Sequence, residues 1–465
     1  MVGLNLGSNV VSGSIALLTA RVGRILLSLV LYVVAARGLP TTGFSDFMIV
    51  LSVAAPLSIA LTLGMNRTLS RSLSMEADRG QLSGSELLSA ACMVCLAGFG
   101  VIAVAGWLAT RVGSGWEADS WILRKLGSLG LPALLWALGM AWSNVVGQAL
   151  IAWRRRVLAA LFEGLGGGPL LVIVALAALM IQGRGQAYLS TILVSAIAVA
   201  VAGGVFSVTV IACSVAAERR RGWGVGAGRP ALLSLRIPNA AYKSVMAGAG
   251  LGTVAQIGLH VANDVDFWVV SILMASPVPA LYVSAKRLAS QLTMPATVLA
   301  SAVLPNMAEF YRKLSPKDVS KLLGICAWLG FLVMLPGAFV MVVWPGPLLG
   351  LLFGSKFALA APILLGLAIG CGGRAFLGPG LDALMMSGRY GAAASSALLD
   401  IVLAAAITLV VATHSRSGEG LALLGVIPIV AALVDLSMAW WCTGARVWAR
   451  PDHPLATVAR LGTYR

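Results

Sequence analysis

Charged residues are scarce in this chain of 465 residues. Only 11% of the residues are Asp, Glu, Lys or Arg, whereas 59% are hydrophobic. That charge content is about half of what an average soluble domain carries. A soluble fold of this composition would precipitate, and no polar interval between residues 14 and 444 is long enough for a separate domain. The composition therefore excludes an ordinary soluble protein and indicates that a membrane is the solvent throughout.

The sequence also lacks the patterns that build disulfide, metal and nucleotide sites. Cys92 and Cys95 have C-x-x-C spacing but no second Cys or His pair, so we interpret them as packing residues. Neither Gly-rich stretch, at 164–169 and 248–252, carries the Lys of a phosphate-binding loop. We therefore expect no metal site and no cofactor. All six Cys lie inside or at the ends of apolar segments, which argues against a disulfide framework: Cys92, Cys95, Cys213, Cys326, Cys371 and Cys442.

Apolar segments long enough to cross a bilayer recur along the whole chain. A spanning helix needs about 20 apolar residues, and helices satisfy their own backbone hydrogen bonds in lipid. The sequence therefore predicts an all-α polytopic membrane protein with about twelve transmembrane helices. The predicted spans are 14–36, 44–65, 86–109, 126–152, 157–181, 188–213, 245–272, 279–303, 321–344, 357–381, 391–412 and 420–444.

One polar interval divides these spans into six and six. Residues 33–46 and 269–282 have similar hydropathy patterns, which predicts two pseudo-symmetric bundles around a central cavity. The predicted organisation is an N-terminal six-helix bundle, a basic cytoplasmic linker, a C-terminal six-helix bundle and a cytoplasmic tail, at 1–213, 214–243, 244–444 and 445–465.

Basic residues set the predicted orientation. The net charge is +16, and Lys and Arg are concentrated in alternate connections, as is typical of loops that stay in the cytoplasm. Both termini are therefore predicted to be cytoplasmic, and the first span is interpreted as an uncleaved signal anchor. Because loops account for most of the positive charge, we expect no nucleic-acid partner.

Several segments together resemble a known family. They are AARGLPTTGFSDF at 35–47, LGMNRTLSR at 63–71, LYVSAKRL at 281–288, LPNMAEFYRKL at 304–314 and WPGPLLGLLFGSKFALAAPIL at 344–364. In order and spacing they are similar to the Wzx-type polysaccharide and oligosaccharide flippases of the multidrug/oligosaccharidyl-lipid/polysaccharide (MOP) exporter superfamily. The resemblance covers most of the chain.

The resemblance implies a substrate and a location. The substrate would be an oligosaccharide linked to undecaprenyl diphosphate, carried from the cytoplasmic to the periplasmic leaflet of a bacterial inner membrane. Transport would proceed by alternating access with a cation gradient, and would serve cell-surface polysaccharide or exopolysaccharide synthesis. Membrane lipids, a polysaccharide polymerase and glycosyltransferases are the other implied partners.

Two alternatives stay open. A multidrug or small-cation exporter of the same superfamily would have a cavity richer in carboxylates than in arginines. A membrane polysaccharide polymerase or glycosyltransferase would need a sizeable periplasmic loop or a carboxylate motif, and the longest predicted periplasmic loop, 110–125, is short. We therefore expect a transporter rather than an enzyme.

Five basic residues cannot be placed in any loop. Arg21 and Arg24 have the i, i+3 spacing that puts both side chains on one helix face. The planar guanidinium fork suits a diphosphate, although snorkelling to the membrane surface is the alternative for both. A charge retained inside the bilayer usually faces a water-filled cavity or a partner. The candidates for binding an anionic head group are Arg21, Arg24, Lys286, Arg287 and Arg374.

Acidic and polar residues accompany them in the second half. Asp264 and Asp266 in the seventh predicted span should lie at the same depth as Lys286 and Arg287 in the eighth, which predicts ion pairs. Such a cluster would bind a coupling cation, bind the sugar, gate the substrate path, or only fix the packing. The candidates for coupling or gating are His260, Asn263, Asp264, Asp266, Asp400 and Asp435.

Overall fold

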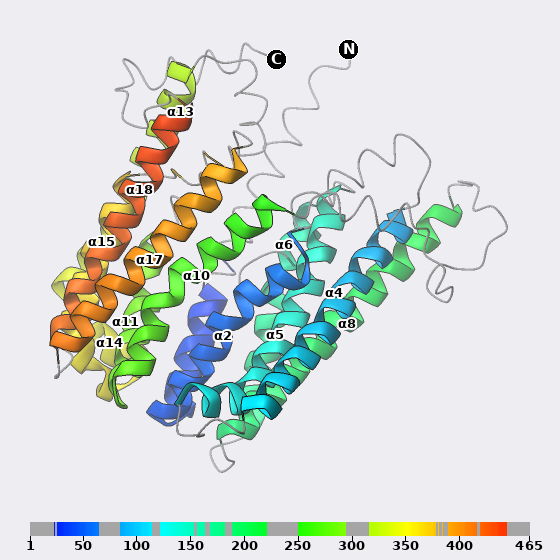
Figure 1. Ribbon diagram of the computed structural model, residues 1–465, viewed down its shortest axis with the longest axis horizontal. Coiled ribbons are helices and arrows are strands. Elements are labelled where there is room, and N and C mark those ends of the chain that lie inside the picture. Colours follow the sequence, from blue (N-terminus) through cyan, green and yellow to red (C-terminus); the bar gives the residue numbers. More distant parts are fainter. Residues whose placement is uncertain are drawn as a thin grey trace. The chain divides into compact units, whose positions relative to one another are not determined.

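The computed structural model shows an all-helical protein (Figure 1). In the described residues every regular element is a helix, which confirms the predicted fold class. The structure describes residues 23, 26–64, 84–113, 121–152, 156–162, 168–181, 188–220, 250–293, 316–377, 380, 384, 389–415 and 419–443.

The chain forms two compact units, Met1–Ile257 and Gly258–Arg465, and the division falls inside one helix, α10. Residues 221–249, which contain most of the predicted linker, lie outside the described residues. The N-terminal unit contains the apolar helix Leu26–Gly38, followed by α2 (Thr41–Leu61), α4 (Gly84–Gly113), α5 (Trp121–Ala152), α6 (Arg156–Phe162), α7 (Gly168–Ile181) and α8 (Tyr188–Arg220).

Helix α10 (Leu251–Leu273) leads into the C-terminal unit. The α-helices that follow are α11 (Val278–Ala289), α13 (Pro316–Val343), α14 (Pro345–Phe353), α15 (Ala361–Leu377), α17 (Tyr390–His414) and α18 (Val426–Thr443). Among the described residues of this unit, three 3₁₀ helices lie between them: η2 (Ser290–Thr293), η3 (Ser355–Ala360) and η4 (Glu419–Gly425).

Helix α5 forms the centre of the N-terminal unit, where it packs against α2, α4 and α8. A Cβ atom on Gly139 of α5 would lie 2.6 Å from the carbonyl oxygen of Val199 on α8, so no side chain fits there. Small residues at such a contact let two helix backbones touch, which is how helices associate where lipid removes the hydrophobic driving force. Phe47 of α2 and Trp136 of α5 complete this core with an edge-to-face contact at 5.7 Å.

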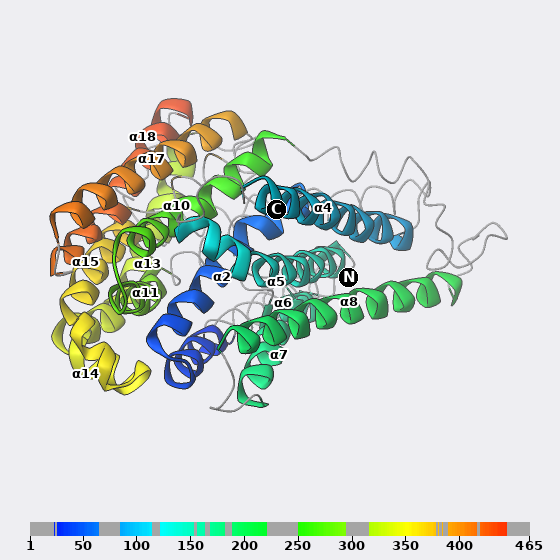
Figure 2. The same cartoon turned by 60° about the horizontal axis from the view of Figure 1, so that its bottom comes forward.

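Helix α15 has the same central role in the C-terminal unit, where it packs against α11, α13, α18 and η4. A Cβ atom on Gly366 or Gly370 would overlap the backbone of η4 at Ala422 or Gly425. Beside this core, α17 and α18 run side by side, as both views show (Figures 1 and 2). Close backbone contact therefore organises both units.

Many described helices have the length and composition of membrane spans. Six qualify on their own, in the ranges Thr41–Leu61, Ser128–Leu150, Tyr188–Cys213, Ser355–Leu377, Tyr390–His414 and Gly420–Cys442. A bent pair, Ala327–Val343 with Pro345–Phe353, forms a seventh if it is one span. Large apolar side chains such as Val201, Val208 and Val402 are exposed along these helices. Surfaces of this kind belong in lipid, so the protein is a multi-pass membrane protein.

All twelve predicted spans overlap helices of the structure, and in the described residues four of them contain more than one helical element: 157–181, 279–303, 357–381 and 420–444. The prediction at 157–181 covers both α6 and α7, between which residues 163–167 lie outside the described residues. The prediction at 279–303 begins as α11 and passes into η2 at Ser290. In η2 the Ser290 and Gln291 side chains bond to the carbonyl oxygen of Arg287, which favours ending the regular helix here.

Candidate functional site

The candidate site lies in the C-terminal unit, on a helical hairpin formed by α10 and α11. Asp266 lies seven residues before the end of α10, and Lys286 lies eight residues after the start of α11. At about 1.5 Å per residue both side chains are about 10 to 12 Å from the turn. The short connection thus brings the acids of one helix to the depth of the bases of the next.

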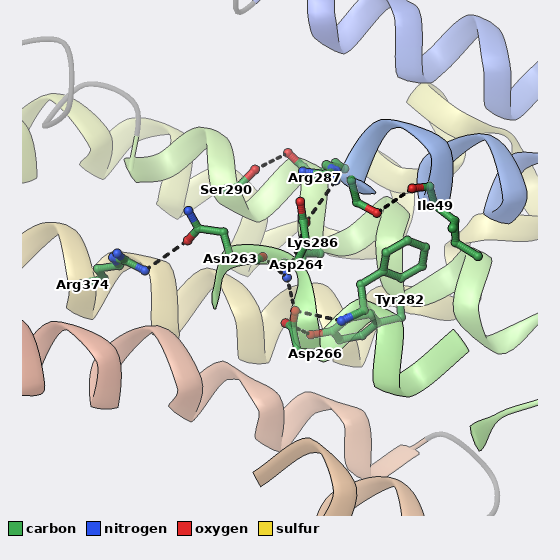
Figure 3. Close-up of polar contacts among 11 residues, drawn as sticks. Ile49, Asn263, Asp264, Asp266, Tyr282, Lys286, Arg287, Ser290 and Arg374 are labelled. Carbon is green, nitrogen blue, oxygen red and sulfur yellow. Dashed lines mark hydrogen bonds and ion pairs between the residues drawn. The ribbon is translucent and has the colours of Figure 1, made fainter. Parts of the chain in front are cut away.

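Asp266 is the most fully coordinated acid of the hairpin. The Tyr282 hydroxyl donates to its Oδ2 at 2.5 Å, and the backbone N–H of Phe267 donates to its Oδ1 at 2.8 Å. Lys286 pairs with the same Oδ1 and also donates to the carbonyl oxygen of Asn263 (Figure 3). Asp266 and Tyr282 are buried, so this carboxylate is held by fixed donors rather than by water.

Asp264 forms the second pair of the hairpin. Its Oδ1 lies 3.1 Å from Nη2 of Arg287 and 3.9 Å from Nζ of Lys286. His260 lies one helical turn before Asp264, within its electrostatic range. The ion pairing that the sequence predicts between the two helices is therefore confirmed.

Arg374 on α15 connects this hairpin to α18. Its Nη1 lies 3.5 Å from Oδ1 of Asn263, and its Nη2 lies 4.0 Å from Oδ2 of Asp435. On the far side, the Ser396 hydroxyl of α17 donates to Oδ1 of Asp435 at 2.7 Å. Contacts from Asn263 through Arg374 and Asp435 to Ser396 therefore link four helices of one unit.

Unlike Asp264, Asp266 and Asp435, Asp400 on α17 has no ion-pair partner among the described residues. It is 4% exposed, and its Oδ1 has no hydrogen-bond partner among the described residues. It lies one turn after Ser396 on the same helix face and within electrostatic range of Asp435 and Arg374. A buried carboxyl group in such a place is either protonated or balanced by a cation.

We use the term charge network for the seven ionisable residues gathered here, which are Asp264, Asp266, Lys286, Arg287, Arg374, Asp400 and Asp435. The three bases each have an acidic partner in the network, and the acids outnumber them by one. This arrangement can hold or release a cation, exchange ion-pair partners, or fix the packing of five helices.

The sequence singled out most of this site but missed two of its hydrogen-bond donors. Tyr282 lies one turn before Lys286 and Ser396 one turn before Asp400, and that spacing was the signal available for both. Arg21 and Arg24 lie outside the described residues. Within the described part of the chain no group of three or more His, Cys, Asp or Glu residues could hold a metal ion.

Comparison with known proteins shows a likeness in fold. No family model matches the sequence, and no curated protein sequence matches it. Among solved structures, a MOP superfamily transporter from Pyrococcus furiosus matches with a TM-score of 0.62 at 13% identity, covering 94% of this chain and 95% of the other. A mutant of the Vibrio cholerae MATE transporter VcmN matches with a TM-score of 0.59 at 14% identity, covering 94% and 97%.

A third structure, an outward-facing multidrug resistance MATE family transporter, matches with a TM-score of 0.56 at 14% identity, covering 94% of this chain and 95% of the other. At these identities the likeness concerns the fold alone. The chain has the two-lobed helical fold of the MATE transporters within the MOP superfamily.

Proposed function

We propose that this protein is a cation-coupled secondary transporter of the MOP superfamily, which exports its substrate by alternating access across a bacterial inner membrane with both termini in the cytoplasm. The single observation that carries the coupling is Asp400, a buried carboxyl group with an oxygen that lacks a hydrogen-bond partner among the described residues. The fold, which extends over nearly the whole chain, supports the transport role.

The cost of burying charged groups supports a functional role for the charge network. Removing an ionised group from water costs several kcal/mol even when a partner is present. Such groups in membrane helices usually mark ion or substrate paths. Asp400 lies within electrostatic range of Asp435, so a proton or a metal cation bound there would relieve the repulsion between the two carboxylates. It would also change the electrostatic attraction between these carboxylates and Arg374. Cation binding would thereby alter the contacts that join α10, α15, α17 and α18.

Two substrate classes fit this transporter, and the comparisons favour the first, a multidrug or organic-cation exporter. The solved structures with this fold include multidrug transporters, and in the charge network acids outnumber bases. The Pyrococcus furiosus transporter is described as having a binding pocket of reverse polarity that suggests a different function. Pocket polarity is therefore a reasonable guide to substrate class within this fold.

The second class is the lipid-linked oligosaccharide, and the sequence favours it. The ordered resemblance to the Wzx-type flippases and the pair Arg21 and Arg24 support it, since guanidinium groups bind diphosphates well. In this case the cations of the first span would recognise the head group and the charge network would serve coupling. Glycosyltransferases would then supply the substrate, and a polysaccharide polymerase would consume it.

One assay decides between the classes. The full chain is reconstituted in proteoliposomes with an imposed proton or Na⁺ gradient. Two probes are followed, ethidium by its fluorescence and a polyprenyl-diphosphate disaccharide carrying a dithionite-sensitive fluorophore by its reduction. Movement of ethidium alone supports the exporter, and movement of the lipid alone supports the flippase. Movement of neither probe under either gradient would contradict the transport proposal.

Coupling is tested in the same vesicles with Asp400→Asn. This variant removes an ionisable group and keeps its shape. We therefore expect the stimulation of transport by the gradient to fall at least about tenfold, which corresponds to a loss of about 1.4 kcal/mol of coupling free energy. The matched control is Thr413→Val, an exposed position on the same helix. An Asp400→Asn protein that responds to the gradient as the control does would remove Asp400 from the cation path.

A further inference from the structure

The helix α14 turns sharply away from the helix before it. The axes of Ala327–Val343 and Pro345–Phe353 differ by 94° across Trp344, and both segments are apolar. Pro345 at the first position of α14 suits a helix start, because its missing N–H group needs no partner there. Helix α13 therefore ends at Val343, and the chain continues at a right angle to it.

The distribution of charge places this bend near the membrane surface. Between Lys321 and Lys356 the sequence contains no charged residue. Lys321 lies 22 residues before Val343, about 33 Å along a helix, close to the roughly 30 Å thickness of the hydrocarbon core. If Lys321 stands at one edge of the core, Val343 reaches the other edge. A helix that leaves α13 at 94° then runs parallel to the membrane plane.

Two faces of the segment 345–360 are both apolar. On the inner side, Leu349, Phe353 and Phe357 are fully buried. Helix α14 and η3, which carry these residues, pack against α11 and α15. On the outer side, Leu351 and Leu359 are 71% and 76% exposed. Exposed leucines on a segment at the edge of the hydrocarbon core are better suited to lipid than to water.

The turn of the segment carries one positive charge. Gly354, with a φ of +108°, separates α14 from η3 in a backbone conformation that other residues rarely adopt. Lys356 follows it, exposed, with its ammonium group 5.3 Å from the centre of the Phe357 ring. No acidic residue lies between residues 344 and 361. An exposed lysine at this depth has a side chain long enough to reach the phosphate layer.

We propose that residues 345–360 form an interfacial lipid-binding hairpin. Leu351 and Leu359 insert at the boundary between head groups and acyl chains of one leaflet, and the Lys356 ammonium group binds the phosphate of an anionic phospholipid. The occupant is lipid because large leucine side chains are exposed on an apolar segment that begins where the apolar helix α13 ends. Charge complementarity selects an anionic head group.

The depth of the hairpin is tested by lipid quenching. Leu351→Cys is labelled with bimane in a full-length protein whose six native cysteines are replaced by Ser, and reconstituted in vesicles of phosphatidylcholine brominated at shallow or deep acyl positions. We expect the shallow bromines to quench most strongly. The control, Val402→Cys, lies at the centre of α17 and is exposed, so deep bromines should quench it most.

Two results would overturn this placement. Strongest quenching of the label at 351 by deep bromines would show a re-entrant helix that enters the core. Quenching by aqueous iodide without quenching by either brominated lipid would show a face that contacts water. Size-exclusion profiles matching the unlabelled protein establish that the variants are folded.

The head group is tested with the label at 351 and brominated phosphatidylglycerol in place of brominated phosphatidylcholine. One lysine near the surface enriches anionic lipid by about fivefold, equivalent to about 1 kcal/mol. We expect this preference to disappear in Lys356→Gln and to persist in Lys356→Arg. Equal quenching by both lipids in the parent protein, or loss of the preference in both variants, would overturn the role of the Lys356 charge.

Discussion

The Asp264–Arg287 pair allows a quantitative test of the charge network. The two side chains are 9% and 19% exposed and their atoms approach to 3.1 Å, so both charges are largely removed from water. Replacing one member of such a pair leaves the other charge without its partner and typically costs about 3 to 5 kcal/mol. Because Arg287 keeps some exposure, we expect Asp264→Asn to cost about 3 kcal/mol of unfolding free energy.

The double variant Asp264→Asn, Arg287→Gln should be far more stable than this single variant. It removes both desolvation penalties together, so we expect a loss below about 1 kcal/mol and a coupling energy of about 2 kcal/mol or more. Thermal unfolding in detergent micelles measures the differences, and about 3 kcal/mol corresponds to roughly 6 to 12 °C for a unit of this size.

Asp264→Glu serves as the matched control, since it keeps the charge. A double variant whose loss equals the sum of the losses of Asp264→Asn and Arg287→Gln would refute the reasoning, because it would show that the pair carries no coupling. A single variant as stable as the parent protein would do so as well, since Arg287 would then not depend on Asp264.

The remaining predictions concern single contacts, and each has its own measurement. Tyr282→Phe removes the hydroxyl that donates to Asp266 and should lower the unfolding free energy by about 1.5 to 3 kcal/mol, and unchanged melting would contradict that bond. Gly139→Ala should destabilise the protein by about 1 to 3 kcal/mol because its Cβ atom would strike Val199 of α8. Gly100→Ala on α4, where nothing lies within 4 Å, should instead stabilise it by about 0.5 to 1 kcal/mol. Equal melting temperatures for the two Gly variants would contradict the close contact of α5 with α8.

The sequence was sufficient to predict the α10–α11 part of the site. Asp266 and Lys286 belong to consecutive helices joined by a short turn, so counting residues from that turn fixes their relative depth. The same count applies to Asp264 and Arg287. Local connectivity thus determined these pairs before any packing was known.

The contacts of Arg374 could not be predicted in this way. Arg374 lies 111 residues from Asn263 and 61 residues from Asp435, so only the packing of α15 against other helices brings them together. In a soluble helix the apolar face points to the core, but in a membrane helix both the buried face and the lipid face are apolar. The sequence of α15 therefore contains little information about which neighbour Arg374 meets.

The sharp bend before α14 was also missed, although it left a signal. Pro345 follows Trp344 directly and Pro347 lies two residues further on, and Pro is common at the first turn of a helix. From the sequence alone, residues 345–356 were predicted only as the connection between two spans. The apolar character of 345–353 does not distinguish a loop from a helix that lies along the membrane surface.

The position of Asp400 has a consequence for the energy available to the proposed transporter. With the three bases balanced by Asp264, Asp266 and Asp435, ionised Asp400 leaves the charge network with one negative charge. One elementary charge that crosses a potential of 100 mV carries about 2.3 kcal/mol. If each turnover moves that one charge, the voltage alone sustains a substrate gradient of about fortyfold, since about 1.4 kcal/mol corresponds to a factor of ten. Electrogenicity would then set the limit to which this membrane protein accumulates its cargo.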